Sequence, residues 1–191
     1  MLVRGFMSVR RPSARIIARI AGGFYLVTFV AGITAMLGRG TLGIAAGVIA
    51  AAAYIVVTLL FYWIFRPVSR GLSLLAAIIS LAGCAIGALS SAHVLSLSIH
   101  PLVFFGFYCA LIGYLVWRST FLPRILGALM VFAGLGWLTF ASAPLARLLS
   151  PYNLAPGIIG EGALTLWLLM MGVKEKQWMQ RAMVGSQSDG S

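Results

Sequence analysis

Acidic side chains are almost absent from this sequence. Only 3 of its 191 residues are Asp or Glu, and together with 14 Lys and Arg the charged residues make up 9% of the chain. A soluble domain carries about a quarter of its residues as charged side chains. Because 61% of the residues are hydrophobic and the mean hydropathy is +1.03, a soluble or disordered protein is excluded. The composition predicts a multi-pass membrane protein.

Cysteine is also scarce, and the sequence lacks the motifs of several enzyme classes. Cys84 and Cys109 each lie inside an apolar run, so both are predicted to be small packing residues and not a disulfide or redox pair. No Walker loop, HExxH, CxxC or GxSxG pattern is present, and no spacing typical of a metal site occurs. The sequence therefore predicts no cofactor, no metal and no catalytic residue.

The net charge of +11 does not indicate a nucleic-acid partner. Nucleic-acid surfaces need clustered Lys and Arg, whereas here the basic residues occur singly or in pairs between apolar runs. The lipid bilayer is the partner that this pattern predicts.

Six apolar runs are long enough to cross a membrane, which takes about 20 helical residues. We expect an all-α bundle of six transmembrane helices, preceded by a basic flank over residues 1–15 and followed by a polar tail over 174–191. The expected spans cover about 16–37, 42–65, 71–92, 101–117, 125–146 and 154–173.

Basic residues alternate between the two sides of these spans. Arg39 and Arg147 fall on one side, and twelve basic residues fall on the side of both termini. Loops rich in Lys and Arg stay in the cytoplasm, so both termini are predicted to be cytoplasmic. The twelve are Arg4, Arg10, Arg11, Arg15, Arg19, Arg66, Arg70, Arg118, Arg124, Lys174, Lys176 and Arg181.

A cleaved signal peptide over residues 1–35 is an alternative interpretation of the N-terminus. We do not favour it, because the apolar run is longer than a signal core and cleavage would leave an odd number of spans.

The basic loop residues Arg66, Arg70, Arg118 and Arg124 are predicted to contact lipid phosphates.

Glycines four residues apart predict close helix contacts. Gly43 and Gly47 form one such pair, and Gly83 and Gly87 form another. Small residues at this spacing let helix backbones approach within a membrane. The partner helix is either in the same chain, in a second copy, or in another membrane protein.

Glu161 is the only carboxylate in any expected span, and intramembrane acids are functional by default. Gly157 and Thr165 share its helix face. The topology places Arg39, His93, His100 and Arg147 in the same half of the membrane. Together with Glu161 and Thr165 they predict an outward-facing polar pocket for a cation, a proton or a small polar ligand. An arginine–glutamate pair that only holds helices together is an equally open alternative.

Several short motifs resemble a known family. They are Ala18-Arg-Ile-Ala-Gly22 with Tyr25-Leu26, Phe105-Gly106, Gly113-Tyr-Leu-Val-Trp-Arg-Ser119, Phe121-Leu-Pro-Arg-Ile-Leu-Gly127, Gly160-Glu161, Leu166-Trp-Leu-Leu169 and Gly172-Val173. Over about residues 15–175 the sequence is similar to small bacterial integral membrane proteins grouped as domain of unknown function 4386. The resemblance implies a bacterial inner-membrane location and several spans. It supplies no activity, cofactor or site residue.

Two classes of function remain open at this point. The first is a non-enzymatic membrane protein, either a bundle that binds a small ligand or ion or an accessory subunit. The second is a transporter or intramembrane enzyme that uses an outer-leaflet polar pocket centred on Glu161.

Overall fold

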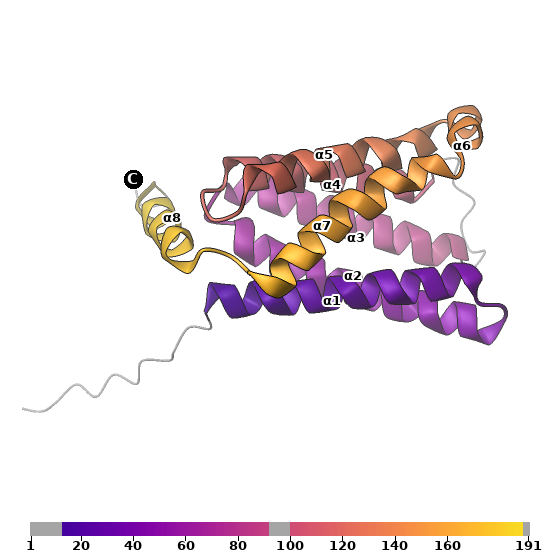
Figure 1. The fold of residues 1–191 in the computed structure, drawn as a ribbon, viewed down its shortest axis with the longest axis horizontal. Coiled ribbons are helices and arrows are strands. Elements are labelled where there is room, and N and C mark those ends of the chain that lie inside the picture. Colours follow the sequence, from indigo (N-terminus) through magenta and orange to yellow (C-terminus); the bar gives the residue numbers. More distant parts are fainter. Residues whose placement is uncertain (1–12, 92–99, 189–191) are drawn as a thin grey trace, which may run out of the picture.

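The computed structural model describes residues 13–91 and 100–188. Within these ranges all regular secondary structure is helical, and no strand is present (Figure 1). Arg4, Arg10, Arg11 and His93 lie outside the described residues. The elements are α1 (Ala14–Leu37), α2 (Thr41–Phe65), α3 (Arg70–Ser91), α4 (Leu102–Arg118), α5 (Arg124–Leu138), η1 (Thr139–Ala141), α6 (Ala143–Leu149), η2 (Tyr152–Leu154), α7 (Ala155–Met170) and α8 (Glu175–Ser188).

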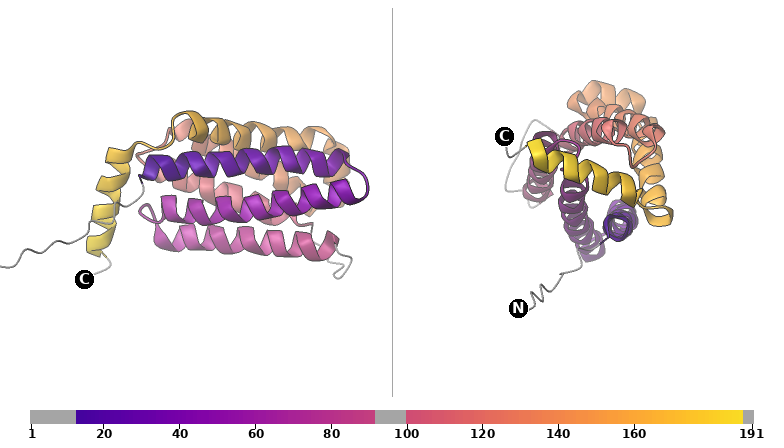
Figure 2. Two further views of the ribbon diagram at one scale, coloured as in Figure 1. Left: turned by 90° about the horizontal axis from the view of Figure 1, so that it is seen from below. Right: turned by 90° about the vertical axis from the view of Figure 1, so that its left-hand side faces the viewer.

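Six of these helices form a closed ring. Each of α1, α2, α3 and α4 packs on the next helix, α5 packs on α7, and contact between α7 and α1 closes the circle (Figures 1 and 2). Five helical segments in the described ranges are long and apolar enough to cross a membrane, and α4 is apolar but shorter, with 17 residues. The predicted class, an all-α polytopic membrane bundle, is confirmed.

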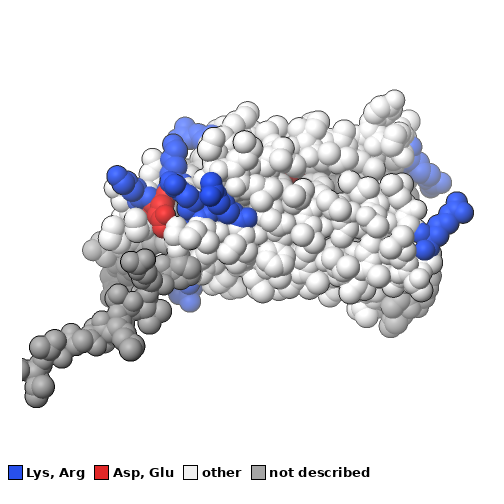
Figure 3. Space-filling view, turned by 60° about the horizontal axis from the view of Figure 1, so that its bottom comes forward, with Lys and Arg blue, Asp and Glu red and all other residues white. Residues whose placement is uncertain are grey.

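The outer surface of the ring is apolar, and its charge lies at the ends. Large side chains such as Ile44 and Leu59 are 70% and 53% exposed. On the face that Figure 3 shows, Lys and Arg gather at the two ends of the elongated molecule and none lies between them. This distribution suits a hydrocarbon layer between two polar boundaries.

Glycine and proline mark the ends of several helices. Gly40 takes a φ of 62° between α1 and α2, a conformation that other residues rarely adopt. Pro123 directly precedes α5, and Pro156 lies in the first turn of α7, where a missing N–H breaks no helical hydrogen bond.

The fifth expected span, 125–146, is not one continuous helix. α5 ends at Leu138, and after η1 the short α6 turns away from the bundle axis (Figure 1). Ser142 is extended, with φ −124° and ψ 113°, and Pro144 then falls in the first turn of α6. Because proline cannot donate to a preceding turn, a new helix start accommodates it better than a continuous helix.

The polar tail forms α8, which lies across one end of the ring (Figure 2). Trp178 fixes it there. Its Nε1–H donates to the Ile64 carbonyl oxygen at 2.9 Å, and its ring stacks on Trp63 with centroids 4.6 Å apart. The helix runs from Glu175 to Ser188.

The predicted glycine pairs contact neighbouring helices of the same chain. A Cβ at Gly43 would lie 2.7 Å from the Gly38 carbonyl oxygen, and a Cβ at Gly83 would lie 2.9 Å from the Cβ of Phe104. These glycines therefore serve packing of α1 on α2 and of α3 on α4. Their use toward a second copy or another protein stays a prediction.

The backbones of α4 and α5 approach closely at paired glycines. A Cβ at Gly113 would lie 2.7 Å from the Gly127 carbonyl oxygen, and the converse distance is also 2.7 Å. The contact repeats seven residues earlier on α4 and seven residues later on α5. There a Cβ at Gly134 would lie 2.7 Å from the Gly106 carbonyl oxygen. Only glycine allows the two backbones to lie this close.

We predict that Gly113→Ala destabilises the bundle by about 1–3 kcal/mol, the usual cost of forcing an extra group into a packed contact. Gly23→Ala is the matched control, since a Cβ there meets nothing within 4 Å and alanine favours a helix by about 0.5–1 kcal/mol. Unfolding in mixed micelles measures both. Equal stability of the two variants would show that the α4–α5 contact is not tight.

Candidate acid site inside the helix ring

Glu161 lies inside the ring and accepts two hydrogen bonds from aromatic side chains. The Tyr25 hydroxyl donates to Oε2 and the Trp137 Nε1–H donates to Oε1, each at 2.5 Å. Only 5% of Glu161 is exposed. It lies six residues, about 9 Å along the axis, from the start of α7. A carboxylate has a separate oxygen for each donor, so both bonds are satisfied at once.

Tyr25 is held by aromatic packing. It is fully buried on α1, and its ring lies 5.7 Å from Phe29 and 5.8 Å from both Tyr54 and Phe61, measured between centroids. Edge and offset contacts of this kind fix ring orientation. The hydroxyl is therefore aimed at Glu161 by α1 and α2 together.

Two glycines of α7 create the space that Trp137 and α5 occupy. A Cβ at Gly157 would overlap the Trp137 indole, and a Cβ at Gly160 would overlap the Leu129 carbonyl of α5. The room beside the carboxylate is thus filled on this side by the protein itself. Gly162 differs, because a Cβ there meets nothing within 4 Å.

Further polar groups line the ring interior. The Thr58 hydroxyl donates to the Tyr54 carbonyl oxygen at 2.9 Å and lies 2.7 Å from the Ser80 hydroxyl. The hydroxyls of Tyr54 and Tyr108 are buried and have no hydrogen-bond partner within the described part of the chain. Cys109, fully buried, lies beside the Glu161 carboxyl group.

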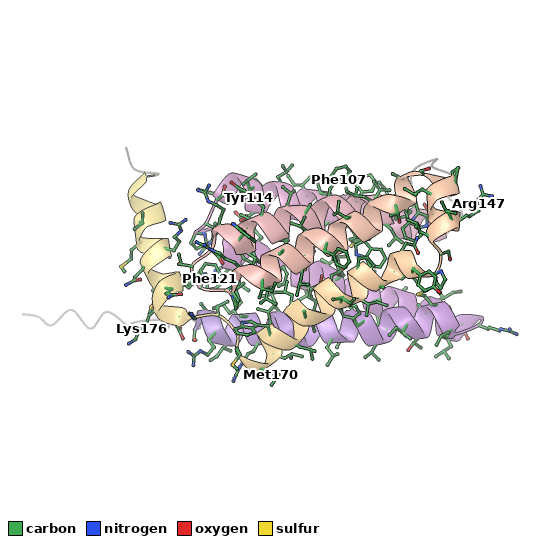
Figure 4. All side chains as sticks on the ribbon, turned by 45° about the horizontal axis from the view of Figure 1, so that its top comes forward. Phe107, Tyr114, Phe121, Arg147, Met170 and Lys176 are labelled. Atoms are coloured by element: carbon green, nitrogen blue, oxygen red, sulfur yellow. The ribbon has the colours of Figure 1, made fainter. Side chains whose placement is uncertain are left out.

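The two arginines that the sequence suggested as partners of Glu161 do not contact it. Arg39 is exposed in the turn after α1, and Arg147 is exposed on α6, where its Nε–H donates to the Ala143 carbonyl oxygen at 3.3 Å. Figure 4 shows Arg147 at the end of the bundle. In the described ranges Glu161 therefore has no ion pair. Its hydrogen-bond donors are the tips of the Tyr25 and Trp137 side chains, which reach it from neighbouring helices.

His100 and Thr165, the other described residues of the predicted pocket, have hydrogen-bond partners other than the carboxylate. His100 precedes α4, its Nδ1 accepts from the Leu102 N–H at 3.3 Å, and its ring lies 5.1 Å from Phe140. Partial burial lowers the pKa of His100. Thr165 shares the buried face of Glu161, but its hydroxyl donates to the Glu161 backbone oxygen at 2.8 Å. His93 lies outside the described residues.

The arginines expected at lipid phosphates lie at the end of the bundle opposite to Arg39 and Arg147. The Arg66 guanidinium lies 5.5 Å from the Trp63 ring centroid, and Arg118 donates to the Tyr114 hydroxyl at 3.3 Å. Arg124 is exposed at the start of α5, and Arg70 begins α3. Their contact with lipid stays a prediction.

Sequence reasoning missed Tyr25 and Trp137 as site residues. Both lie in apolar runs, where an aromatic residue is usually packing. The available signal was that a buried tyrosine hydroxyl or indole N–H needs an acceptor, and Glu161 is the only intramembrane carboxylate. Among the described residues no group of three or more His, Cys, Asp or Glu is placed to hold a metal ion.

We predict that Tyr25→Phe destabilises the bundle by about 1.5–3 kcal/mol, the cost of losing a hydrogen bond to a charged group. Tyr54→Phe is the matched control. Its hydroxyl is buried without a described partner, so its removal is expected to be neutral or stabilising. Unfolding in mixed micelles compares the two. A larger loss for Tyr54→Phe would contradict this arrangement of donors.

The chain has relatives whose function is not described. Residues 97–172, which include Trp137 and Glu161, match the family described as "Domain of unknown function (DUF4386)". A protein of Archaeoglobus fulgidus, named only "Uncharacterized protein", is 34% identical over 129 residues, 63% of this chain and 77% of the relative. No solved structure matches the chain. On the match and the archaeal relative together, the chain belongs to the DUF4386 family.

Proposed function

We propose that this chain is a non-enzymatic multi-pass protein of the bacterial inner membrane, with both termini in the cytoplasm, and that Glu161 binds a proton or a small cation inside its helix ring. The single observation that carries this proposal is a buried carboxylate that has two neutral donors and, among the described residues, no basic side chain in contact with it. A buried negative charge without a counter-ion is costly in hydrocarbon, and a proton or cation removes that cost.

The neighbours of the carboxylate also favour a cation. The hydroxyls of Tyr54 and Tyr108 have buried oxygens without described partners, and oxygen is the ligand type that hard cations prefer. No observation gives comparable support to catalysis, since neither arginine nor His100 lies at the carboxylate.

The charge distribution supports the orientation. Nine described basic residues lie where α1, α3 and α5 begin, where α2, α4 and α7 end, and in α8. Two, Arg39 and Arg147, lie at the other end. Basic ends of membrane bundles face the cytoplasm. The nine residues are Arg15, Arg19, Arg66, Arg70, Arg118, Arg124, Lys174, Lys176 and Arg181.

Proton binding is tested by infrared spectroscopy of the carboxyl C=O band during a pH titration. We expect wild type and Glu175→Gln to gain a band of a buried carboxyl group on acidification, and Glu161→Gln to lack it. Glu175 is the matched control because it is the acid at the α8 end. If Na⁺, K⁺ or an organic ammonium ion competes, the titration moves to lower pH. Identical spectra of wild type and Glu161→Gln at every pH and in every salt would refute the proposal.

Orientation is tested by labelling single cysteines in intact cells, with Cys84 and Cys109 replaced by alanine. Leu148→Cys lies on the exposed side of α6 and Met179→Cys on the exposed side of α8. We expect a membrane-impermeant maleimide to label position 148 at once and position 179 only after lysis. The reverse pattern would place both termini outside.

A further inference from the structure

A cavity lies at the basic end of the bundle, away from Glu161. Its volume is about 310 Å³, and it is bounded by the first turn of α1, the end of α7 and the connection between α4 and α5. The residues that matter for its chemistry are Arg15, Phe121, Trp167, Gly172 and Lys174. Figure 4 shows Phe121, Met170 and Lys176 at this end of the bundle, where α8 leaves it. No sequence motif pointed to this cavity.

The wall of the cavity is held in place by backbone contacts. Gly172 takes a φ of 66°, which reverses the chain after α7, and a Cβ there would lie 2.9 Å from Arg15 Cγ and 3.0 Å from the Arg15 carbonyl oxygen. The next link is the Lys174 N–H, which donates to the Phe121 carbonyl oxygen at 3.1 Å. These contacts hold Gly172 against Arg15 and the backbone of Lys174 against Phe121.

The cavity combines positive charge with an apolar floor. Arg15 and Lys174 are exposed, whereas Phe121 and Val173 are each only 1% exposed and Trp167 is partly buried. One turn along α1, Arg19 donates to the Met170 carbonyl oxygen at 2.8 Å. The acid at this end, Glu175, accepts from the Ser13 hydroxyl at 2.6 Å.

A ligand that fits must be anionic at one end and apolar at the other. Arginine and lysine bind phosphate oxygens, and tryptophan at a membrane boundary packs against the glycerol and acyl region. Basic pockets at the cytoplasmic face of helix bundles suit anionic lipid headgroups. A free phosphate ion would use the two cations but not the floor.

We propose that the cavity between Arg15, Trp167 and Lys174 binds the headgroup of an anionic phospholipid. This site is independent of the acid inside the ring, so its test does not depend on Glu161. It differs from general attraction of lipid to the basic end because it requires two particular cations around one cavity.

The test measures thermal unfolding of the full chain in neutral detergent during titration with phosphatidylglycerol. We expect a rise in the unfolding temperature for wild type and for the control Arg39→Gln/Arg147→Gln, which loses two charges at the other end. For Arg15→Gln/Lys174→Gln the phosphatidylglycerol concentration at half-effect should rise roughly thirty-fold. Each lost basic residue removes about 1 kcal/mol of attraction to an anionic lipid, and about 1.4 kcal/mol corresponds to a tenfold change in affinity. Phosphatidylcholine should have little effect on any of the proteins.

Two results would overturn the proposal. One is an unchanged phosphatidylglycerol titration for Arg15→Gln/Lys174→Gln, which would mean that lipid binds elsewhere. The other is an equal rise with inorganic phosphate, which would identify a soluble anion as the ligand.

If the double variant does not fold, phosphatidylglycerol with brominated acyl chains provides a second measurement. It should quench wild-type fluorescence more than that of Trp167→Phe, and equal fractional quenching would also overturn the proposal.

Discussion

The two hydrogen bonds of Glu161 lie where the helix ring closes. α7 packs on both α1 and α5, and Glu161 accepts from Tyr25 on the first and from Trp137 on the second. In hydrocarbon an unsatisfied polar group costs several kcal/mol. Moving α7 away from either neighbour would therefore leave a donor and an acceptor unpaired together. The carboxylate is therefore a structural link between three helices, and in our proposal it also binds a proton or a small cation.

These two roles are compatible. A carboxylate that holds two donors still has lone pairs to offer, and the hydroxyls of Tyr54 and Tyr108 lie buried near it without described partners. Protonation would weaken the acceptor of both hydrogen bonds at once, because the neutral group attracts donors less than the charged one. Occupancy of the acid and the packing of α7 between α1 and α5 are thus coupled by the same atoms.

The class of fold could be predicted from the sequence because hydropathy and charge act over whole spans. The apolar runs and the basic loops needed no knowledge of which helices touch. The break at Ser142 was harder, since Pro144 is surrounded by apolar residues and does not interrupt the run. The partners of Glu161 could not be predicted, because they depend on which face of α1 and α5 turns inward. Charge suggested Arg39 and Arg147, but proximity along the membrane axis is not contact.

The stretch from Arg118 to Gly127, which joins two motifs of the family resemblance, has a packing role. In the structure Phe121 and Leu122 are buried, the Phe121 carbonyl oxygen accepts from Lys174, and Gly127 lies against Gly113. The stretch therefore joins the α4–α5 contact to the turn after α7. Because Phe121 also lines the cavity at the basic end, one short stretch contributes both to the α4–α5 contact and to that cavity.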